Sequence, residues 1–147
     1  MRTDMLNPSH LEILAAGTKG VLATIRRNGR PQLSNVLYLY DPDEHTLLVS
    51  VTAGRAKTRN AQRDPRVSMH VTSTDFWTWV VADGEASFSP VATEGFDDAT
   101  EELVRLYRGI AGEHPDWAEF RAAQVAEQRQ VLRLHIVRTY GTPGPRS

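Results

Sequence analysis

The sequence predicts a mostly β protein with flanking helices, of the α+β class: an antiparallel six-stranded barrel with helices on its outside. The first three strand-like segments are separated only by tight turns, so they pair as antiparallel neighbours. The longer helical patterns come late in the chain, whereas a parallel doubly wound sheet needs a crossover helix between successive strands. The six expected strands cover residues 20–27, 31–40, 46–51, 66–72, 76–89 and 130–140.

Turn residues divide the strand-like segments. Asn28-Gly29 is a strong signal for a hairpin between the first two strands. Asp64-Pro65 ends a short basic helix expected over 55–63. Asp83-Gly84 interrupts the longest segment, where it is either a turn or a bulge that lets one strand curve.

Caps and periodicity predict three further helices. Asn7-Pro8 starts the first, which ends near Gly17. A helix over 97–112 has acidic residues early and arginines late, as the helix dipole favours. A helix over 115–127 begins with proline at its first position. Residues 141–147 are rich in proline and glycine and are expected to form a flexible tail.

Composition limits the classes of function. The 147 residues are 40% hydrophobic with a formal net charge of −1, which predicts one domain over 1–147 and gives no bulk attraction to nucleic acid or anionic membranes. The chain lacks cysteine, an apolar run of the ~20 residues that a membrane helix needs, and a signal peptide. Its five histidines show no metal-ligand spacing. We therefore expect a cytoplasmic protein that has no metal site and binds neither nucleic acid nor membrane.

The segment after the third strand carries the clearest chemical signal. A strand ending in Ser50 and Val51 reaches a glycine, and a short helix with four cations then begins. The free N–H groups and the dipole at a helix N-terminus favour phosphate, and Arg and Lys add charge-assisted hydrogen bonds. The alternative is a solvated surface helix, which charge runs usually form. The hydroxyl and glycine before the cations favour an anion site that includes Arg55 and Lys57.

Other candidate residues have two interpretations. Trp77 and Trp79 share one face of a strand, which favours packing in the core or at a dimer interface over contact with a ligand ring. Asn35 shares a face with apolar neighbours and needs a partner if it is buried. That partner is either a ligand or the backbone.

Several segments together resemble the pyridoxamine-phosphate-oxidase-like split-barrel family. They are residues 29–36, 48–51, 55–60 and 64–67. Within this family, segments 106–114 and 137–141 resemble the actinobacterial branch that uses the deazaflavin coenzyme F420. The Pro/Gly tail differs from the Arg- and Trp-bearing closing strand of true pyridoxamine phosphate oxidases, which shifts the expectation away from vitamin B6 oxidation.

The resemblance implies a split barrel of the FMN-binding type and a homodimer with two cofactor sites at its interface. It places the cofactor phosphate near Ser50 and the basic helix, the ring system against residues 32–36, and aromatic residues of the partner near 77–79. The residues expected to bind the cofactor are Gln32, Ser34, Asn35, Val36, Ser50, Val51, Arg55, Lys57, Thr58, Asn60, Trp77 and Trp79.

The expected activity is transfer of hydride from reduced F420 to an electron-poor C=C or C=N bond of a small molecule. A cofactor that carries this chemistry requires no catalytic triad, and none is visible. One alternative is an FMN-binding oxidoreductase of the same fold. Another is a non-catalytic protein that binds flavin, deazaflavin or haem, with His135 as a weak axial-ligand candidate.

Overall fold

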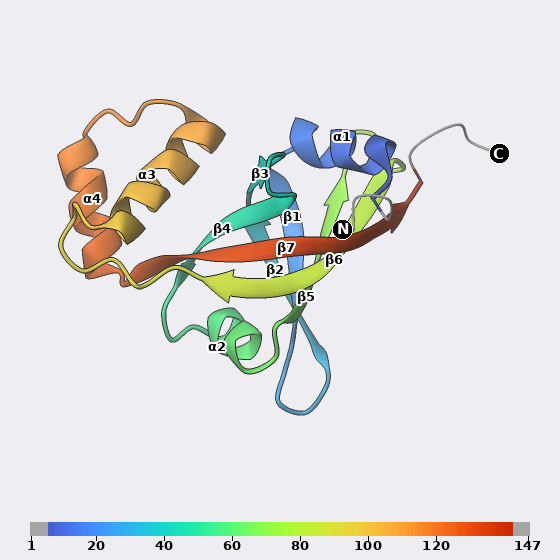
Figure 1. Ribbon diagram of the computed structural model, residues 1–147, viewed down its shortest axis with the longest axis horizontal. Helices are drawn as coiled ribbons and strands as arrows, with labels where there is room; N and C mark the ends of the chain where they lie inside the picture. The colour runs from blue at the N-terminus through green and yellow to red at the C-terminus, as the bar shows by residue number, and fades with distance from the viewer. Residues whose placement is uncertain (1–5, 143–147) are drawn as a thin grey trace.

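The computed structural model describes residues 6–142 as one curled antiparallel sheet with four helices (Figure 1). The strands are β1 (Lys19–Ile25), β2 (Pro31–Leu37), β3 (Leu39–Asp41), β4 (Thr46–Thr52), β5 (Arg66–Thr72), β6 (Trp79–Phe88) and β7 (Arg129–Gly141). The helices are α1 (Pro8–Ala16), α2 (Ala56–Arg63), α3 (Asp98–Ala111) and α4 (Trp117–Ala126). The strand order β2-β1-β5-β6-β7-β4-β3 confirms the antiparallel fold class.

The sheet has seven strands rather than the six expected, because segment 31–40 divides at Tyr38. β2 pairs with β1 at one edge of the sheet, whereas β3 pairs with β4 at the other edge. The Tyr38 side chain is fully buried between them, and its hydroxyl donates to the Leu14 carbonyl at 2.7 Å. At this buried residue the chain passes from one edge of the sheet to the other. The alternating apolar pattern of residues 31–40 does not reveal this change of partner strand.

β6 is one long curved strand, which confirms the bulge and excludes the turn at its centre. The pairing with β7 shifts register between Asp83 and Gly84. A Cβ on Gly84 would lie 2.3 Å from the His135 carbonyl oxygen, so the close approach of the two strands requires glycine. The strand starts at Trp79, later than the predicted residue 76. The preceding turn is held by Asp75, whose Oδ1 accepts from the Trp77 and Thr78 amides at 3.0 and 3.1 Å.

Apolar side chains from both halves of the sheet fill the inside of the barrel. Leu22, Leu47, Met69 and Leu132 are fully buried there, and α1 packs against the same core through Leu14. A second cluster lies under α3, where Leu103 and Leu106 meet Val131 of β7 and Ala92. The helical hairpin α3–α4 is thereby fixed to the outside of the barrel, while α2 lies at another end of it (Figure 1).

Two further boundaries, both in the last third of the chain, differ from the prediction. The fourth helix begins at Trp117 instead of residue 115, because Asp116 caps it by accepting from the Glu119 amide at 3.1 Å. Gly141 ends β7, and the Thr142 hydroxyl accepts from the Trp79 amide at 3.0 Å, so these first two residues of the predicted tail are bound to the sheet. The rest of that tail, 143–147, lies outside the described residues. No helix of the described chain is both long and apolar enough for a membrane span.

Candidate functional site

A cleft of about 420 Å³ opens where β2 and β4 meet the start of α2 and the α3–α4 hairpin. Four residues predicted from the sequence line this cleft, although they come from three separate elements. They are Asn35 and Val36 of β2, Ser50 of β4 and Lys57 of α2. The fold therefore brings the predicted anion site and part of the predicted ring site to one place.

Lys57 is the central cation of the cleft. Its side chain is half-buried in the first turn of α2, and within residues 6–142 it forms no ion pair. Burial, together with the charges of Arg55 and Arg129, lowers the pKa of the Lys57 ammonium. The crowding of cations around an ammonium without a carboxylate makes this end of the cleft suited to an anion.

Arg129 is a cleft residue that the sequence analysis missed. It begins β7, pairs with Thr52 of β4, and its Nη1 donates to the Ser50 hydroxyl at 3.5 Å. Its Nε donates to Glu127 at 2.9 Å, so one edge of the guanidinium is engaged. No local motif marks Arg129. Only the pairing of β7 with β4 would have placed it beside Ser50.

Three of the predicted site residues hold the structure together behind the cleft. Thr58 is fully buried, and its hydroxyl donates to the Thr52 carbonyl at 2.9 Å. Asn60 donates through Nδ2 to Thr24 and Gln32, at 3.2 and 3.4 Å, and so links α2 to β1 and β2. These bonds fix where the first turn of α2 lies, and hence where Lys57 points.

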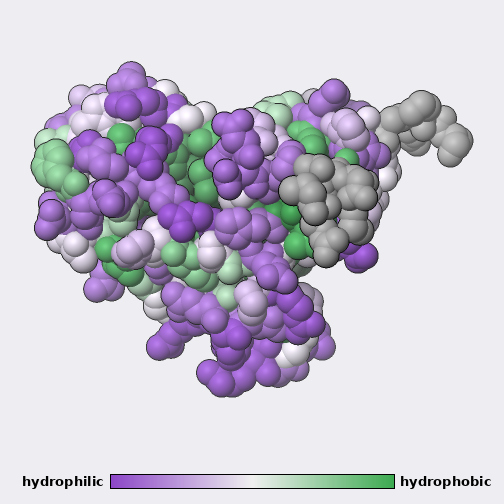
Figure 2. Space-filling view, viewed as in Figure 1, coloured by the Kyte–Doolittle hydropathy of each residue, from purple (hydrophilic) through white to green (hydrophobic). Residues whose placement is uncertain are grey.

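The remaining predicted residues do not line the cleft of their own chain. Val51 is fully buried in the barrel core, Ser34 is half-buried on β2, and Arg55 is exposed at the N-cap of α2. Trp77 is 67% exposed on the turn before β6, and Trp79 contacts His70 and Tyr140. The surface over α2 and the β1–β2 hairpin is hydrophilic (Figure 2).

The apolar part of the cleft lining comes from the α3–α4 hairpin and was also missed. Leu106, Tyr107 and Ile110 of α3 and Phe120 of α4 line it. Leu103 and Leu106 of α3 are also buried in the second cluster. The apolar face of α3 extends beyond this core and borders the cleft. Helical periodicity does not distinguish residues packed in a core from residues that line a cleft.

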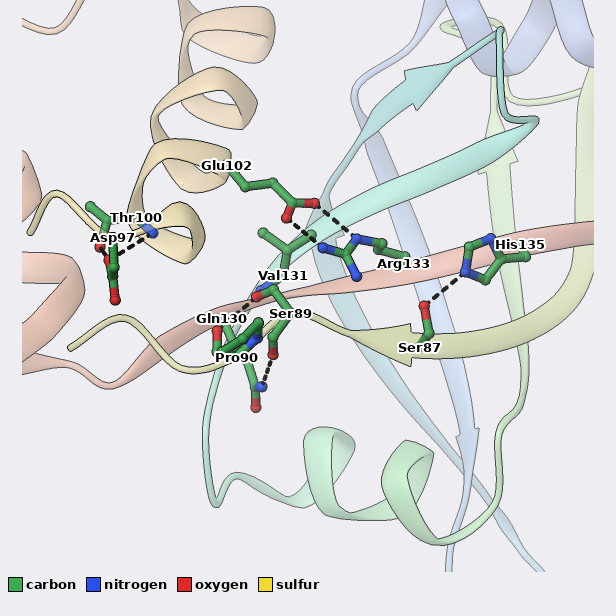
Figure 3. Close-up of polar contacts among 10 residues, drawn as sticks. All are labelled: Ser87, Ser89, Pro90, Asp97, Thr100, Glu102, Gln130, Val131, Arg133 and His135. Atoms are coloured by element: carbon green, nitrogen blue, oxygen red, sulfur yellow. Dashed lines mark hydrogen bonds and ion pairs between the residues drawn. The ribbon is translucent and has the colours of Figure 1, made fainter.

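Polar contacts fix the α3–α4 hairpin against the sheet (Figure 3). Glu102 of α3 accepts from Arg133 of β7 through two hydrogen bonds of 2.9 and 2.5 Å. At the start of α3, hydrogen bonds from Thr100 and then Thr93 hold the pKa of the Asp97 carboxyl far below its usual range.

Further along β7, His135 contacts Ser87 through Nε2 at 2.8 Å and Thr46 through Nδ1 at 3.3 Å. Both ring nitrogens of His135 are therefore engaged.

The exposed face of β2 beside the cleft carries two leucines, one on each side of exposed Asn35. Leu33 and Leu37 of β2 are 66% and 51% exposed, and they alternate with half-buried residues along this edge strand. A second groove on this side is lined by Val21, His70 and the segment 35–37. Because 35–37 also lines the cleft, the exposed apolar face and the cation-lined cleft are continuous.

A curled antiparallel sheet with helices packed on its outside is the architecture of a split barrel. The chain belongs to the pyridoxamine 5'-phosphate oxidase family, whose model matches residues 6–142. This confirms the family resemblance and the split-barrel fold.

Solved structures of the same fold have varied descriptions. An F420 reductase is 24% identical with a TM-score of 0.67, and the match covers 91% of this chain and 98% of that one. The conserved hypothetical protein Rv2991 from Mycobacterium tuberculosis is 22% identical, with a TM-score of 0.71 and coverages of 96% and 90%. The haem storage protein HutZ from Vibrio cholerae is 18% identical, with a TM-score of 0.66 and coverages of 98% and 98%. These likenesses support the fold.

Proposed function

We propose that this protein is an F420-dependent oxidoreductase that transfers hydride from the reduced deazaflavin to an electron-poor C=C or C=N bond of a small molecule. The observation that carries the proposal is the cleft lined by Ser50, Arg129 and Lys57, the last without an ion pair within residues 6–142, beside the edge strand β2. This donor set suits a phosphate group at the end of a redox cofactor.

The fit of a phosphate rests on four kinds of donor. The Lys57 ammonium supplies a mobile point charge, and the Arg129 guanidinium supplies N–H groups on the edge that Glu127 leaves free. The first turn of α2 has no side-chain cap on its backbone N–H groups. Ser50 adds a hydroxyl between β4 and Arg129. Together these residues would hold the phosphate, and each charge-assisted bond contributes roughly 1.5–3 kcal/mol.

Bound reduced F420 would supply the hydride, and the chain would bind and orient the cofactor. Asn35 and Val36 on the edge strand would present polar groups to the ring. The resemblance of segments 106–114 and 137–141 to the F420-using branch favours F420 over FMN, and an F420 reductase among the similar folds agrees with this choice. Haem bound through His135 is disfavoured, because Ser87 and Thr46 engage both of its ring nitrogens.

We further propose that two copies of the chain form a homodimer over the exposed face that includes Leu33 and Leu37. Apolar side chains of this kind are typical of an interface between subunits. The continuity of this face with the cleft at residues 35–37 would place a cofactor site at the edge of each interface. The exposed aromatic turn at 76–77 is then available to the site of the partner.

Competitive binding tests the proposal. The purified protein is titrated with F420 and with FMN, using cofactor fluorescence, and riboflavin serves as the control that lacks the phosphate. We expect F420 to bind more tightly than FMN. Riboflavin should bind at least about tenfold more weakly than FMN, because it lacks the phosphate and therefore loses at least one charge-assisted hydrogen bond. Tighter binding of FMN would support the FMN-dependent alternative instead. Failure of both cofactors to bind below ~1 mM, which is only ~4 kcal/mol, would overturn the proposal.

A further inference from the structure

A serine hydroxyl and an imidazole meet on the outer face of the sheet, outside the cation-lined cleft (Figure 3). The Oγ atom of Ser87, on β6, lies 2.8 Å from Nε2 of His135, on β7. His135 is exposed and Ser87 is half-buried, so a molecule in solution can reach both side chains. A hydroxyl within hydrogen-bond reach of a base that a third group orients is the arrangement that activates a serine as a nucleophile.

The third group is Thr46 of β4, and its contacts fix which nitrogen of His135 carries the proton. The Thr46 hydroxyl donates to the Glu44 carbonyl at 2.9 Å, so its oxygen is left to accept. The contact of this oxygen with His135 Nδ1 at 3.3 Å therefore uses an N–H at Nδ1. Because a neutral imidazole carries one such proton, Nε2 accepts from the Ser87 hydroxyl. Nε2 is thus the base for the serine proton.

A cation lies across from the serine. Arg133 of β7 is the residue paired with Ser87 in the register of β6 and β7, and directly paired side chains lie on the same face of a sheet. Glu102 engages Nε and Nη2 of Arg133, whereas Nη1 forms no hydrogen bond within residues 6–142. A positively charged N–H group beside a nucleophile stabilises negative charge on a carbonyl oxygen under attack.

The imidazole also borders a groove that is separate from the cofactor cleft. This groove has a volume of about 310 Å³ and lies between α3 and the strands β3 and β4, with His135 and Arg133 in its lining. Its apolar part comes from Leu39, Leu48 and Leu106, and charged side chains of both signs complete it. The apolar part suits a short hydrocarbon chain whose polar end lies near His135.

We propose that Ser87 and His135 form a second catalytic site, which hydrolyses carboxylic esters with a short apolar acyl chain. Ser87 Oγ attacks the ester carbonyl carbon while its proton passes to His135 Nε2, and Arg133 stabilises the negative carbonyl oxygen. The bond to the alcohol then breaks, Nε2 returns the proton to the leaving alkoxide, and an acyl ester remains on Ser87. Water attacks this ester with the same base, and release of the acid restores the hydroxyl. The cycle uses no redox cofactor, so the inference goes beyond the proposed function and does not depend on it.

Hydrolysis of p-nitrophenyl hexanoate by the purified protein tests the pair, with release of p-nitrophenolate as the signal. Ser87→Ala and His135→Gln should each lower the protein-catalysed rate by about 100-fold, the usual contribution of a positioned base. Ser9→Ala, on α1, is the matched control and should keep the full rate. Circular dichroism confirms that each variant is folded. A folded Ser87→Ala protein with an unchanged rate would overturn the inference, because the imidazole would then act alone.

The covalent intermediate gives a second and independent readout. After brief incubation with p-nitrophenyl acetate and acid quenching, fragment mass spectrometry should locate an acetyl group on Ser87. The label should be absent from His135→Gln, in which the hydroxyl is present and the base is missing. Acetylation of Lys57 or of other side chains without acetylation of Ser87 would overturn the inference.

Thr46 is a positioning residue in this account, and the groove selects the acyl chain. Thr46→Val keeps the shape of the buried side chain but removes its hydroxyl, so the rate should fall several-fold, and Thr46→Ser should restore it. The hexanoate ester should be cleaved about tenfold faster than the acetate ester, because the longer chain buries more apolar surface. Equal rates for the two esters would overturn the assignment of the groove.

The same variants separate this inference from the proposed function. Ser87→Ala should bind F420 and FMN with unchanged affinity, since Ser87 does not line the cofactor cleft. Ester hydrolysis that depends on Ser87 in a protein that binds neither cofactor would contradict the proposed function alone. Cofactor binding without hydrolysis that depends on Ser87 would contradict this inference alone.

Discussion

The cations around the α3–α4 hairpin and those at α2 are used differently. On the α3–α4 side, three arginines each pair with a carboxylate on a neighbouring element or turn, whereas on α2 the cations Arg55, Lys57 and Arg59 form no ion pair within residues 6–142. The paired residues are Arg108 with Glu113 at 2.7 Å, Arg121 with Glu101 at 2.6 Å and Arg133 with Glu102 at 2.5 Å.

The difference teaches what each set of cations is for. A cation paired with a carboxylate joins two parts of the fold, and its charge is already satisfied. Lys57 is instead crowded by Arg55 and Arg129, and its lowered pKa reports that burial and this crowding disfavour its charge. A bound anionic ligand offsets this penalty, because it favours the charged form of the Lys57 ammonium. We therefore expect removal of a paired residue to affect stability and removal of Lys57 to affect ligand binding.

Removing the Lys57 ammonium should have the largest effect. Lys57→Ala is expected to weaken FMN and F420 binding by about 10- to 100-fold, the equivalent of roughly 1.5–3 kcal/mol for a lost charge-assisted bond. The free energy of unfolding should change by less than about 0.5 kcal/mol, because no ion pair is broken. Fluorescence titration and urea unfolding measure the two quantities. Arg59→Ala, on the same helix but outside the cleft, is the control, and unchanged affinity in Lys57→Ala would remove the phosphate role.

Breaking a paired cation should affect stability. Glu102→Gln leaves Arg133 without its carboxylate, and the two side chains are only 16% and 31% exposed. We expect a loss of about 1–2 kcal/mol in the free energy of unfolding, below the range for a fully buried pair. Urea denaturation should show a lower midpoint at an unchanged slope. Glu94→Gln, in the exposed loop before α3, should leave the midpoint in place. A midpoint unchanged in both variants would contradict the structural role of this pair.

Freeing a partly paired cation should strengthen binding. Glu127→Gln removes the carboxylate that engages Arg129 Nε at 2.9 Å and also lines the cleft. The affinity for FMN should rise by up to about fivefold, since an exposed ion pair contributes at most about 1 kcal/mol. Glu119→Gln, on the exposed side of the same helix, provides the comparison by the same titration. Weaker binding in Glu127→Gln would show that Glu127 positions Arg129 for the ligand.

The smallest expected effect is on the number of protons that the protein takes up when the ligand binds. A bound phosphate favours charged Lys57 and raises its lowered pKa, so the affinity for FMN should fall as pH rises through the pKa of Lys57 in the free protein. Between that pKa and the pKa in the complex, binding takes up a fraction of a proton. Calorimetry in two buffers of different ionisation heat, between about pH 8 and 10, measures this uptake. Lys57→Ala should abolish it, and an uptake that persists in that variant would assign it to another group.

Local signals in the sequence predicted much of the fold. Asn28-Gly29 gave the hairpin between β1 and β2, and the interpretation of Asp83-Gly84 as a bulge was confirmed by the register shift. Alternation and caps located the other elements to within a few residues. The division of segment 31–40 was missed because Tyr38 is buried by contacts with α1, which alternation along the strand does not encode.

Part of the candidate site could also be predicted from residues close together in the sequence. Ser50 and Lys57 were selected by the hydroxyl, the glycine and the cations that follow one strand, and the structure places both at the cleft. Arg129 lies 79 residues from Ser50 in the chain and meets it only through the pairing of β4 with β7. The ring of Phe120 reaches the same cleft only because the α3–α4 hairpin packs on the outside of the barrel.

The amino-acid sequence by itself determined the strands, the turns between them and a cationic helix start, because hydrophobic period, turn geometry and capping act over a few residues. Tertiary structure alone decided the pairing of Arg121 with Glu101 and of Arg133 with Glu102, which apolar face borders a cleft, and which side chains line that cleft together. Those properties depend on contacts between residues far apart in the chain. Their positions are set by the packing of the whole barrel, and no short segment carries that information.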